Sequence, residues 1–558
     1  MQGLPWMLSR TLLLFLPLLA VSCIQVPKAP GVKEPFWSWN RLTERRIAQE
    51  LSRAAEAWDA LMSDTPGRRR RAELESRYEA AVAGVIRTWS GVQLPRTWQN
   101  GTEVRLNGHG FVIRLDPPSP QPGSITPRQL DQLILASKVA VNYGRQRVVT
   151  EGLGVPVVGH VLSDQEPVNG HATLPPNGAF LSLTAIIEFD LPAASPGATR
   201  TARLRLWDPL HHVGITATPT AADTPPLAAD YTAARQLALD RGFLRGFSLS
   251  GLLYPDKVLK ESRLYQLEPY DPKRIPVVFV HGLMSDPHIW FNCVNAIYAN
   301  PELRARYQPW YFLYPTGLAV PSTAARLRES LNDMRNRLDP DHNDPGMNRM
   351  VLVGHSMGGL LSRLQTTDSG DAFWNAYFQK KPEDLLLSDD SRASLVSRLK
   401  FQRQPYVSRL IFIAVPHHGS ELADKGLVMR LAKLIRLPID TLLIATELMS
   451  GNVNALNPQI RDWGAYAFLS LGTLSPRHPY LTAMNSRPVA VPHHSIIGKV
   501  GDGPLKDSSD RVVPYSSSHL PTGSEKIVSW WHGCVEHPDV VAEVTRRLHE
   551  HLASSRRK

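Results

Sequence analysis

The chain has 558 residues, of which 43% are hydrophobic and 20% are charged, and this composition excludes wholesale disorder and a fibrous repeat. Lys and Arg outnumber Asp and Glu by 62 to 51, which gives a net charge of +11. The excess is spread along the chain without a nucleic-acid-reading motif, so we expect no nucleic-acid partner. A basic surface of this kind favours anionic membranes or acidic substrates.

The first 22 residues predict an export signal. Arg10 is followed by an apolar run over residues 11–21, which suits a secretory signal and is too short to span a bilayer. The run ends in Ala20-Val21-Ser22-Cys23, which resembles a bacterial lipobox. We therefore expect Cys23 to be lipidated and the protein to be an outer-membrane or cell-surface lipoprotein. An ordinary signal peptide, with a periplasmic or secreted product, is the alternative.

Residues 23–95 predict a linker followed by two helices. Apolar residues recur at spacings of three and four from Ile47 to Leu61 and again from Leu74 to Trp89, which places each set on one helical face. A turn-type sequence over residues 64–67 separates the two sets. We predict an antiparallel helical hairpin that serves as a scaffold.

Residues 96–226 predict a small β-rich accessory domain. The apolar period shortens after residue 100, and Asn107-Gly108 is a dipeptide typical of a hairpin turn. A long strand-like run extends from Phe180 to Leu191. We find no catalytic constellation in this domain.

Residues 227–558 predict an α/β domain with a mostly parallel sheet and helices on both faces. Continuous apolar runs, as expected for strands buried on both faces, lie at residues 276–280, 310–314, 350–353, 410–414 and 495–497. Helical patterns such as the one over residues 324–338 separate these runs. Strands that alternate with helices indicate parallel strands with right-handed crossovers.

The run at residues 350–353 leads directly into a Gly-x-Ser-x-Gly sequence formed by Gly354, Ser356 and Gly358. A buried strand before it and a helical pattern after it are the context in which the serine is a nucleophile with an exposed hydroxyl. Side chains at 354 or 358 would collide with neighbouring backbone on such a tight turn. The alternative is a glycine-rich turn without chemistry.

A serine nucleophile needs a base, and the base needs an orienting acid. In this architecture the chain order is serine, then acid, then histidine. Of the aspartates after the strand near residue 497, we favour Asp510, and Asp502 is the alternative. Of the histidines after the predicted last strand, we favour His532 over His537, which lies at the entry to the final helix.

Ester hydrolysis places negative charge on the carbonyl oxygen, and backbone N–H groups can stabilise it. Met357 supplies one such group directly after the nucleophile, and Leu283, after the strand at 276–280, is our candidate for the other. Gly282 allows that loop to approach closely. We expect His281 to be structural.

Residues 419–490 predict a helical insertion that caps an acyl pocket. Its apolar residues form a stripe at Leu427, Val428, Leu431, Leu434 and Ile435, which continues at Leu442, Leu443, Ile444 and Leu448. Ordinary packing of the insertion is the alternative. Elsewhere, Cys293 and Cys534 remain in the mature chain, either as a pair or as two buried thiols, and no Cys/His cluster has zinc-site spacing.

From about residue 270 to 555 the chain resembles the bacterial lipase-like α/β-hydrolases and, more loosely, the GPI-inositol deacylases. The resemblance is carried by residues 279–283, 312–317, 354–359, 414–420, 510–514 and 517–520, and by His532 ahead of a helix. It implies an α/β-hydrolase fold and a triad of Ser356, Asp510 and His532, the same residues that chain order selects.

We therefore expect a serine hydrolase that cleaves carboxylic esters through an acyl-enzyme, without a metal or an organic cofactor. Its expected partners are an ester or lipid substrate and a membrane surface reached through the lipid anchor. An acyltransferase with the same triad is one alternative. A catalytically inert surface lipoprotein that acts as a binding module is another.

Overall fold

The structure is a computed structural model that describes residues 41–63, 67–88, 102–106, 109–116, 130–141, 146–161, 178–190, 199–211, 226–241, 248–268, 270–424 and 434–555. The chain divides into two compact units, Met1–Glu44 and Arg45–Lys558. Only the first residues of helix α2 are described in the first unit. The predicted export signal and Cys23 lie outside the described residues. Within the described part, none of the helices is long and apolar enough to cross a membrane.

The N-terminal part of the second unit contains two helices and a six-stranded sheet. The helices are α2 (Arg41–Ser63) and α3 (Arg68–Arg87). The strands are β1 (Thr102–Leu106), β2 (His109–Asp116), β3 (Leu130–Leu135), β5 (Val155–Val161), β6 (Ala179–Phe189) and β7 (Arg200–Trp207). Their order is β1-β2-β7-β6-β5-β3, and only β2 and β7 pair in parallel. The predicted hairpin is present as the antiparallel pair β1–β2, whereas β3 and β5 were not predicted.

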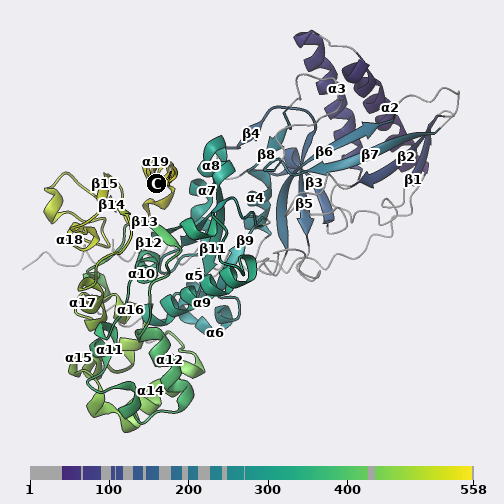
Figure 1. The fold of residues 1–558 in the computed structure, drawn as a ribbon. Coiled ribbons are helices and arrows are strands. Elements are labelled where there is room, and N and C mark those ends of the chain that lie inside the picture. The colour runs from purple at the N-terminus through teal and green to yellow at the C-terminus, as the bar shows by residue number, and fades with distance from the viewer. Residues whose placement is uncertain are drawn as a thin grey trace, which may run out of the picture. The chain divides into compact units, whose positions relative to one another are not determined.

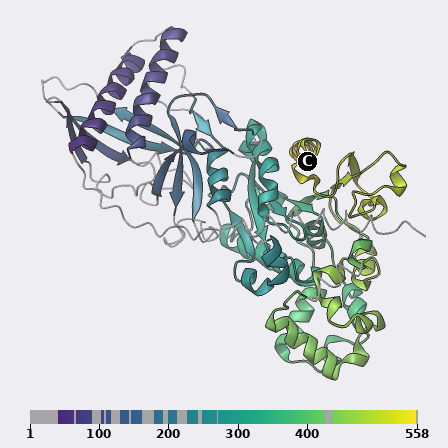
Figure 2. The same ribbon diagram turned by 180° about the vertical axis from the view of Figure 1, so that it is seen from behind.

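Both helices pack on one face of this sheet and share a single hydrophobic core with it (Figures 1 and 2). The ring centroids of Trp58 on α2 and Tyr78 on α3 are 5.6 Å apart. Arg200 of β7 forms two hydrogen bonds, 2.9 and 2.6 Å long, with the carboxylate of Asp59 on α2. The helical hairpin and the β-rich segment therefore bury their apolar faces against each other.

Tyr78 completes the hydrogen bonding of β6 where its neighbour ends. The pairing of β5 with β6 stops at Ala185, and the main chain of Ile187 extends beyond it. The buried Tyr78 hydroxyl donates to the Ile187 carbonyl at 2.9 Å and accepts from the Ile187 N–H at 2.8 Å. A side chain from a helix thus takes the place of a missing strand.

We expect Tyr78→Phe to lower the free energy of unfolding by about 1–3 kcal/mol, because both main-chain groups of Ile187 are left buried without a partner. Urea denaturation of the purified chain measures this value. Tyr254→Phe is the matched control, since Tyr254 is 38% exposed. Equal effects of the two substitutions would contradict this role of Tyr78.

The segment between β7 and β9 connects this part to the seven-stranded sheet. It contains β8 (Ala229–Asp230), α4 (Ala233–Asp240), α5 (Ser248–Leu253) and α6 (Pro255–Leu259). Strand β8 pairs with β4 (Val149–Thr150), which lies between β3 and β5 in the chain.

His211, which follows β7, lies between two carboxylates. Its Nδ1 is 2.8 Å from Asp208 and its Nε2 is 3.5 Å from Asp271. The hydrogen bond to Asp208, followed by the interaction with the nearby Asp271 carboxylate, raises the pKa of His211 to about 10.

This raised pKa predicts a pH-dependent contribution to stability. A histidine whose pKa is higher in the folded chain than its ordinary 6.5 stabilises the fold fully below pH 6.5, and the contribution is lost as the pH rises through about 10. We expect the free energy of unfolding to fall more steeply between these pH values in the wild type than in His211→Gln. Urea denaturation at both pH values measures the difference, and parallel declines would contradict it.

The C-terminal part of the unit is built on a seven-stranded sheet. Its strands are β9 (Arg263–Gln266), β10 (Ile275–Val280), β11 (Tyr307–Leu313), β12 (Met350–His355), β13 (Val407–Ile413), β14 (His493–Gly498) and β15 (Ser524–Val528). The order is β15-β14-β13-β12-β10-β11-β9, and all pairs are parallel except β11–β9. The mostly parallel sheet that the sequence predicts is therefore present.

Helices cover both faces of this sheet (Figure 1). Val277 and Phe279 of β10 face a core that includes residues of α7 (Phe291–Ala299) and α19 (Pro538–Ser555). The alternate residues Val278 and Val280 face a second core with α9 (Val320–Leu338) and α10 (Met357–Leu364). Burial on both faces explains why the sequence of β10 is apolar at every position. Outside the insertion at residues 419–490, the other α-helices here are α8 (Pro301–Arg306), α11 (Ala372–Tyr377), α12 (Asp389–Leu399) and α18 (Tyr515–Ser518).

The insertion at residues 419–490 is helical where it is described. It contains α14 (Ile439–Gly451), α15 (Pro458–Trp463), α16 (Ser470–Thr473) and α17 (Pro479–Asn485). The predicted residues Leu427, Val428 and Leu431 lie outside the described residues.

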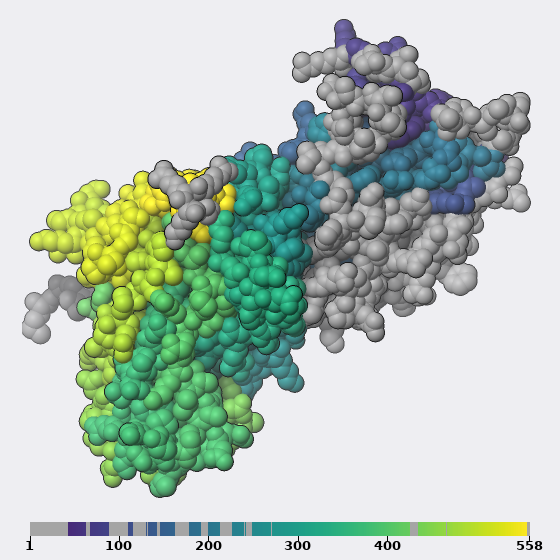
Figure 3. All heavy atoms as spheres, viewed as in Figure 1, coloured from purple at the N-terminus to yellow at the C-terminus, as the bar shows by residue number. Residues whose placement is uncertain are grey.

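The predicted continuation of the apolar stripe along α14 is wrong in part. Ile444 and Leu448 are buried, but Leu442 and Leu443 are 48% and 56% exposed. Consecutive residues of a helix point about 100° apart, so residues 442–444 cannot share one buried face. An apolar side of α14 therefore meets solvent. This helix is labelled at the lower end of Figure 1, and Figure 3 draws all heavy atoms in the same view.

Candidate active site

Ser356 occupies the turn between β12 and α10. Its backbone angles are φ +52° and ψ −127°, a conformation that is strained for any residue other than glycine. The Ser356 N–H donates to the Ile413 carbonyl at the end of β13, at 2.9 Å. Strain of this kind is typical of the strand-to-helix turn that carries a nucleophilic serine.

The two flanking glycines leave no room for a side chain. A Cβ at Gly354 would lie 2.6 Å from the Gly359 Cα, and a Cβ at Gly358 would lie 2.2 Å from the Val280 carbonyl oxygen. Both contacts are with backbone, which cannot move aside cheaply. A side chain at position 354 or 358 would therefore collide with neighbouring backbone.

The structure brings together the three side chains that the sequence predicts. The Ser356 Oγ lies 2.9 Å from the His532 Nε2, and the His532 Nδ1 lies 2.7 Å from the Asp510 Oδ2. Ser356, Asp510 and His532 follow β12, β14 and β15, whose carboxyl ends meet at one edge because these strands are parallel. The alternatives lie elsewhere, since Asp502 is exposed and the His537 Nδ1 is 3.9 Å from Asp539.

The carboxylate of Asp510 is held on both oxygens. It is 1% exposed, and its Oδ1 accepts hydrogen bonds from the N–H groups of Val512 at 2.9 Å and Val513 at 2.7 Å. Its main-chain carbonyl accepts from the His532 N–H at 3.0 Å. These bonds aim the Oδ2 at the His532 ring and fix the distance between the two loops.

His355, the residue before the serine, has a structural part at this site that the sequence did not predict. Its Nε2 donates to the main-chain carbonyl of His532 at 3.0 Å. Burial, with the nearby His532 adding to it, lowers the pKa of His355 to about 3, so the ring is neutral at ordinary pH. His355 therefore ties the nucleophile turn to the loop that carries His532. The sequence contains one indication of this structural part, because His355 lies within the Gly-x-Ser-x-Gly sequence.

The start of α10 and the loop after β10 both lie beside Ser356. Met357 is the first residue of α10, so its N–H has no acceptor within the helix. A Cβ at Gly282 would lie 2.9 Å from the Ser356 Cβ, which shows that the loop after β10 touches the serine. Leu283 is the next residue of this loop.

His281 supports this loop. Its ring stacks on Tyr314 with centroids 4.3 Å apart, and the Tyr314 hydroxyl donates to the His281 carbonyl at 2.5 Å. Burial lowers the pKa of His281 to about 4. A neutral, stacked ring of this kind agrees with the structural part that the sequence predicts for it.

The exposure of the serine differs from expectation. Ser356 is only 8% exposed, because the loop at Gly282 and the ring of His532 lie against it. Trp530 and Trp531, which precede His532, are 44% and 47% exposed. Two aromatic side chains that precede His532 in the chain are therefore in contact with solvent.

The two cysteines are separate buried thiols, which resolves the alternative left open by the sequence. The Cys293 Sγ lies 3.8 Å from the Val535 carbonyl oxygen. Burial raises the pKa of both thiols to about 12. Within the described ranges, no group of three His, Cys, Asp or Glu side chains could hold a metal ion.

Comparisons with known proteins find no family model and no curated protein that matches this chain. Among solved structures, it is similar to a Bacillus licheniformis lipase in mature form, with 17% identity, 51% of this chain and 97% of the lipase covered, and a TM-score of 0.30. The Staphylococcus hyicus lipase has 14% identity, coverage of 51% and 96%, and a TM-score of 0.33. EstA from Clostridium botulinum has 12% identity, coverage of 49% and 86%, and a TM-score of 0.31.

These identities and TM-scores are low, so the class is defined by the molecule's own features. The sheet is mostly parallel, a strained serine turn follows a central strand, and serine, acid and histidine follow one another along the chain. This arrangement is typical of the α/β-hydrolase fold.

Proposed function

We propose that the protein is a serine hydrolase of carboxylic esters. The observation that carries this proposal is the continuous hydrogen-bonded path from the Ser356 Oγ through the His532 ring to the Asp510 carboxylate. Ser356 attacks the acyl carbon while the His532 Nε2 takes the hydroxyl proton. His532 then gives this proton to the leaving alcohol, and Asp510 holds the ring in the required tautomer.

The second half of the reaction reverses the roles. Water attacks the acyl carbon of the acyl-enzyme while His532 takes a proton from it. His532 then gives this proton to the Ser356 Oγ, and the carboxylic acid leaves. In both steps the carbonyl oxygen becomes negative. The N–H groups of Met357 and Leu283 stabilise this charge because they are in place before the reaction begins.

An apolar acyl group is the substrate class that fits the surroundings of Leu283. Leu252, Ile435, Leu469 and Leu471 form a small buried cluster, and Leu283 and Met284 pack against it. Three of these four residues come from the insertion at 419–490. This placement supports the proposal that the insertion shapes the acyl side of the site.

A fluorophosphonate probe and a p-nitrophenyl ester series test the function. We expect the probe to label the wild type and not Ser356→Ala, and we expect release of nitrophenol to depend on Ser356. A peak at long acyl chains would indicate a lipase, and a peak at acetate or butyrate an esterase. Absence of both labelling and turnover would overturn the proposal and favour an inert binding module. Acyl transfer to an added lipid alcohol, in preference to water, would identify an acyltransferase.

We propose further that the protein is exported and lipid-anchored through Cys23. The support is the sequence alone, namely the apolar run at 11–21 and the lipobox-like residues that end it. Membrane fractionation of wild type and Cys23→Ser after labelling with radioactive palmitate tests this proposal. Equal label in both chains would overturn it.

A further inference from the structure

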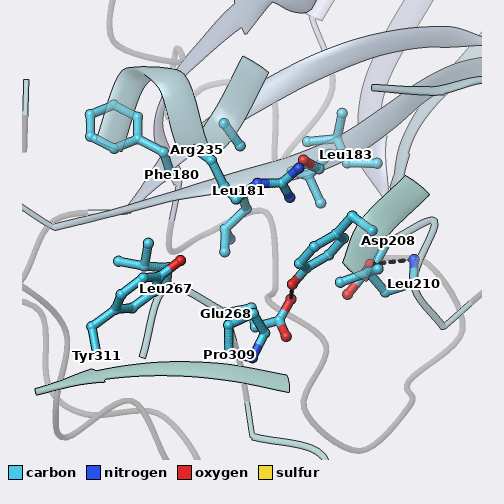
Figure 4. A pocket seen from close by; sticks show the side chains of 14 residues that line it. Phe180, Leu181, Leu183, Asp208, Leu210, Arg235, Leu267, Glu268, Pro309 and Tyr311 are labelled. Carbon is cyan, nitrogen blue, oxygen red and sulfur yellow. Dashed lines mark hydrogen bonds between the residues drawn. The ribbon is translucent and has the colours of Figure 1, made fainter. Parts of the chain in front are cut away.

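A cavity lies away from the residues of the candidate active site, between the two sheets of the second unit. Its walls come from β6, from α4 and from β11, and none of Ser356, Asp510 and His532 lines it. The cavity leaves about 50 Å³ for the centres of water-sized molecules. Figure 4 shows Arg235 of α4 among the apolar side chains of Leu181 and Leu183.

Arg235 is a buried cation without a carboxylate in direct contact, although Glu268 and Asp230 act on it from further away. It is 9% exposed, and its Nη2 donates to the Asn295 Oδ1 at 2.9 Å. Its guanidinium carbon lies 4.1 Å from the centroid of the Tyr298 ring. The Nε is buried and has no hydrogen-bond partner. Burial lowers the pKa of Arg235.

The carboxylates nearest to the cavity are already engaged. Glu268 binds the Arg274 Nη1 at 2.8 Å and accepts a hydrogen bond from the Tyr298 hydroxyl. Asp208 accepts from the Leu210 N–H at 2.8 Å and pairs with His211. Among the described residues, no carboxylate lies within salt-bridge distance of Arg235.

A buried guanidinium normally has its charge compensated, because desolvation of an unpaired charge is costly. Its planar fork matches a carboxylate, to which it can donate two parallel hydrogen bonds. The remaining wall is largely apolar and includes Leu181, Leu183, Leu267 and Tyr311. A doubly charged anion such as phosphate suits this cavity poorly, because one guanidinium compensates one charge and Glu268 lines the same wall.

We propose that this cavity is a binding site for a small monocarboxylate with a short alkyl body, with its carboxylate on the Arg235 fork and its alkyl chain against Leu181 and Leu183. The site is separate from the proposed ester hydrolysis and does not depend on it. A bound monocarboxylate supplies a counter-charge in direct contact with Arg235, which the more distant Glu268 and Asp230 do not. It also replaces solvent in the apolar part of the cavity.

Isothermal titration calorimetry of the full chain with sodium hexanoate tests the proposal, at constant ionic strength. We expect Arg235→Met to weaken hexanoate binding at least about tenfold, because a charge-assisted pair of hydrogen bonds is lost. Arg241→Met is the matched control, since Arg241 is exposed just beyond α4. Hexanoate bound near Ser356 would be insensitive to Arg235, so dependence on Arg235 is the decisive readout.

Thermal melting establishes that the variant is folded. We expect Arg235→Met to melt no lower than the wild type without ligand, since an unpaired buried charge is replaced by an apolar chain. If Arg235→Met fails to fold, Arg235→Lys provides the comparison, because it keeps the charge and loses the fork. Unchanged hexanoate affinity in the folded variant, no binding by the wild type up to about 10 mM, or equally tight binding of phosphate would each overturn the proposal.

Discussion

Replacement of Ser356 by alanine is expected to reduce ester turnover by about 10⁴–10⁶-fold, because the hydroxyl that lies 2.9 Å from the His532 Nε2 is the proposed nucleophile. His532→Ala is expected to cost a similar factor, since the serine then has no base. The double variant should be no worse than either single one, because residues that act as a unit are not additive. Initial rates on a p-nitrophenyl ester, with the enzyme concentration verified, measure all three.

Two matched variants serve as controls for this result. Ser397→Ala changes an exposed serine on α12, and His537→Ala changes the alternative histidine five residues after His532. Both are expected to retain turnover within a few-fold of the wild type. A large loss of turnover in His537→Ala, with little loss in His532→Ala, would show that His537 is the base. That result would contradict the proposed mechanism.

Asp510→Asn is expected to lower kcat by about 10⁴-fold with little change in folding. The Asp510 Oδ2 is 2.7 Å from the His532 Nδ1, and an amide NH₂ placed there would favour the opposite tautomer, with the proton on Nε2. A ring in that tautomer cannot accept the serine proton. The kcat of the same ester, compared with the melting temperature of the variant, separates this effect from loss of structure.

Asp502→Asn is the control for Asp510, since Asp502 lies exposed in the same loop region. We expect its kcat to equal that of the wild type. If both aspartates tolerate the change, the proposed orienting acid is wrong, even if Ser356 remains essential. If Asp502→Asn is inactive while Asp510→Asn is active, the orienting acid is Asp502 and not Asp510.

Local sequence patterns predicted the parts of this protein whose signal lies within a few neighbouring residues. The buried strand β10 is apolar throughout because both of its faces are covered, and this is visible without coordinates. Gly354 and Gly358 were predicted for a steric reason that depends only on the tightness of one turn. Chain order then narrowed the acid and the base to two candidates each.

Contacts between distant segments could not be predicted in this way. The sequence does not show why Asp510 is preferred to Asp502. The reason lies in the contact between the loops after β14 and β15, where the His532 N–H donates to the Asp510 carbonyl. The bond from His355 to the same loop spans 177 residues. Strands β3 and β5 went unpredicted, because their stability comes from pairing within the six-stranded sheet and from packing against α3.

The amino-acid order alone thus specified an α/β domain, a strained serine turn and the chemical types of its partners, because these follow from local sterics and from the periodicity of burial. The folded chain was needed to bring Asp510 and His532, which the sequence only favoured, into contact with each other and with Ser356, to show that Cys293 and Cys534 are two free thiols, and to leave Arg235 as a buried cation beside a cavity. Those outcomes depend on which loops and faces come into contact, and such contacts arise from packing between residues that are far apart in the sequence.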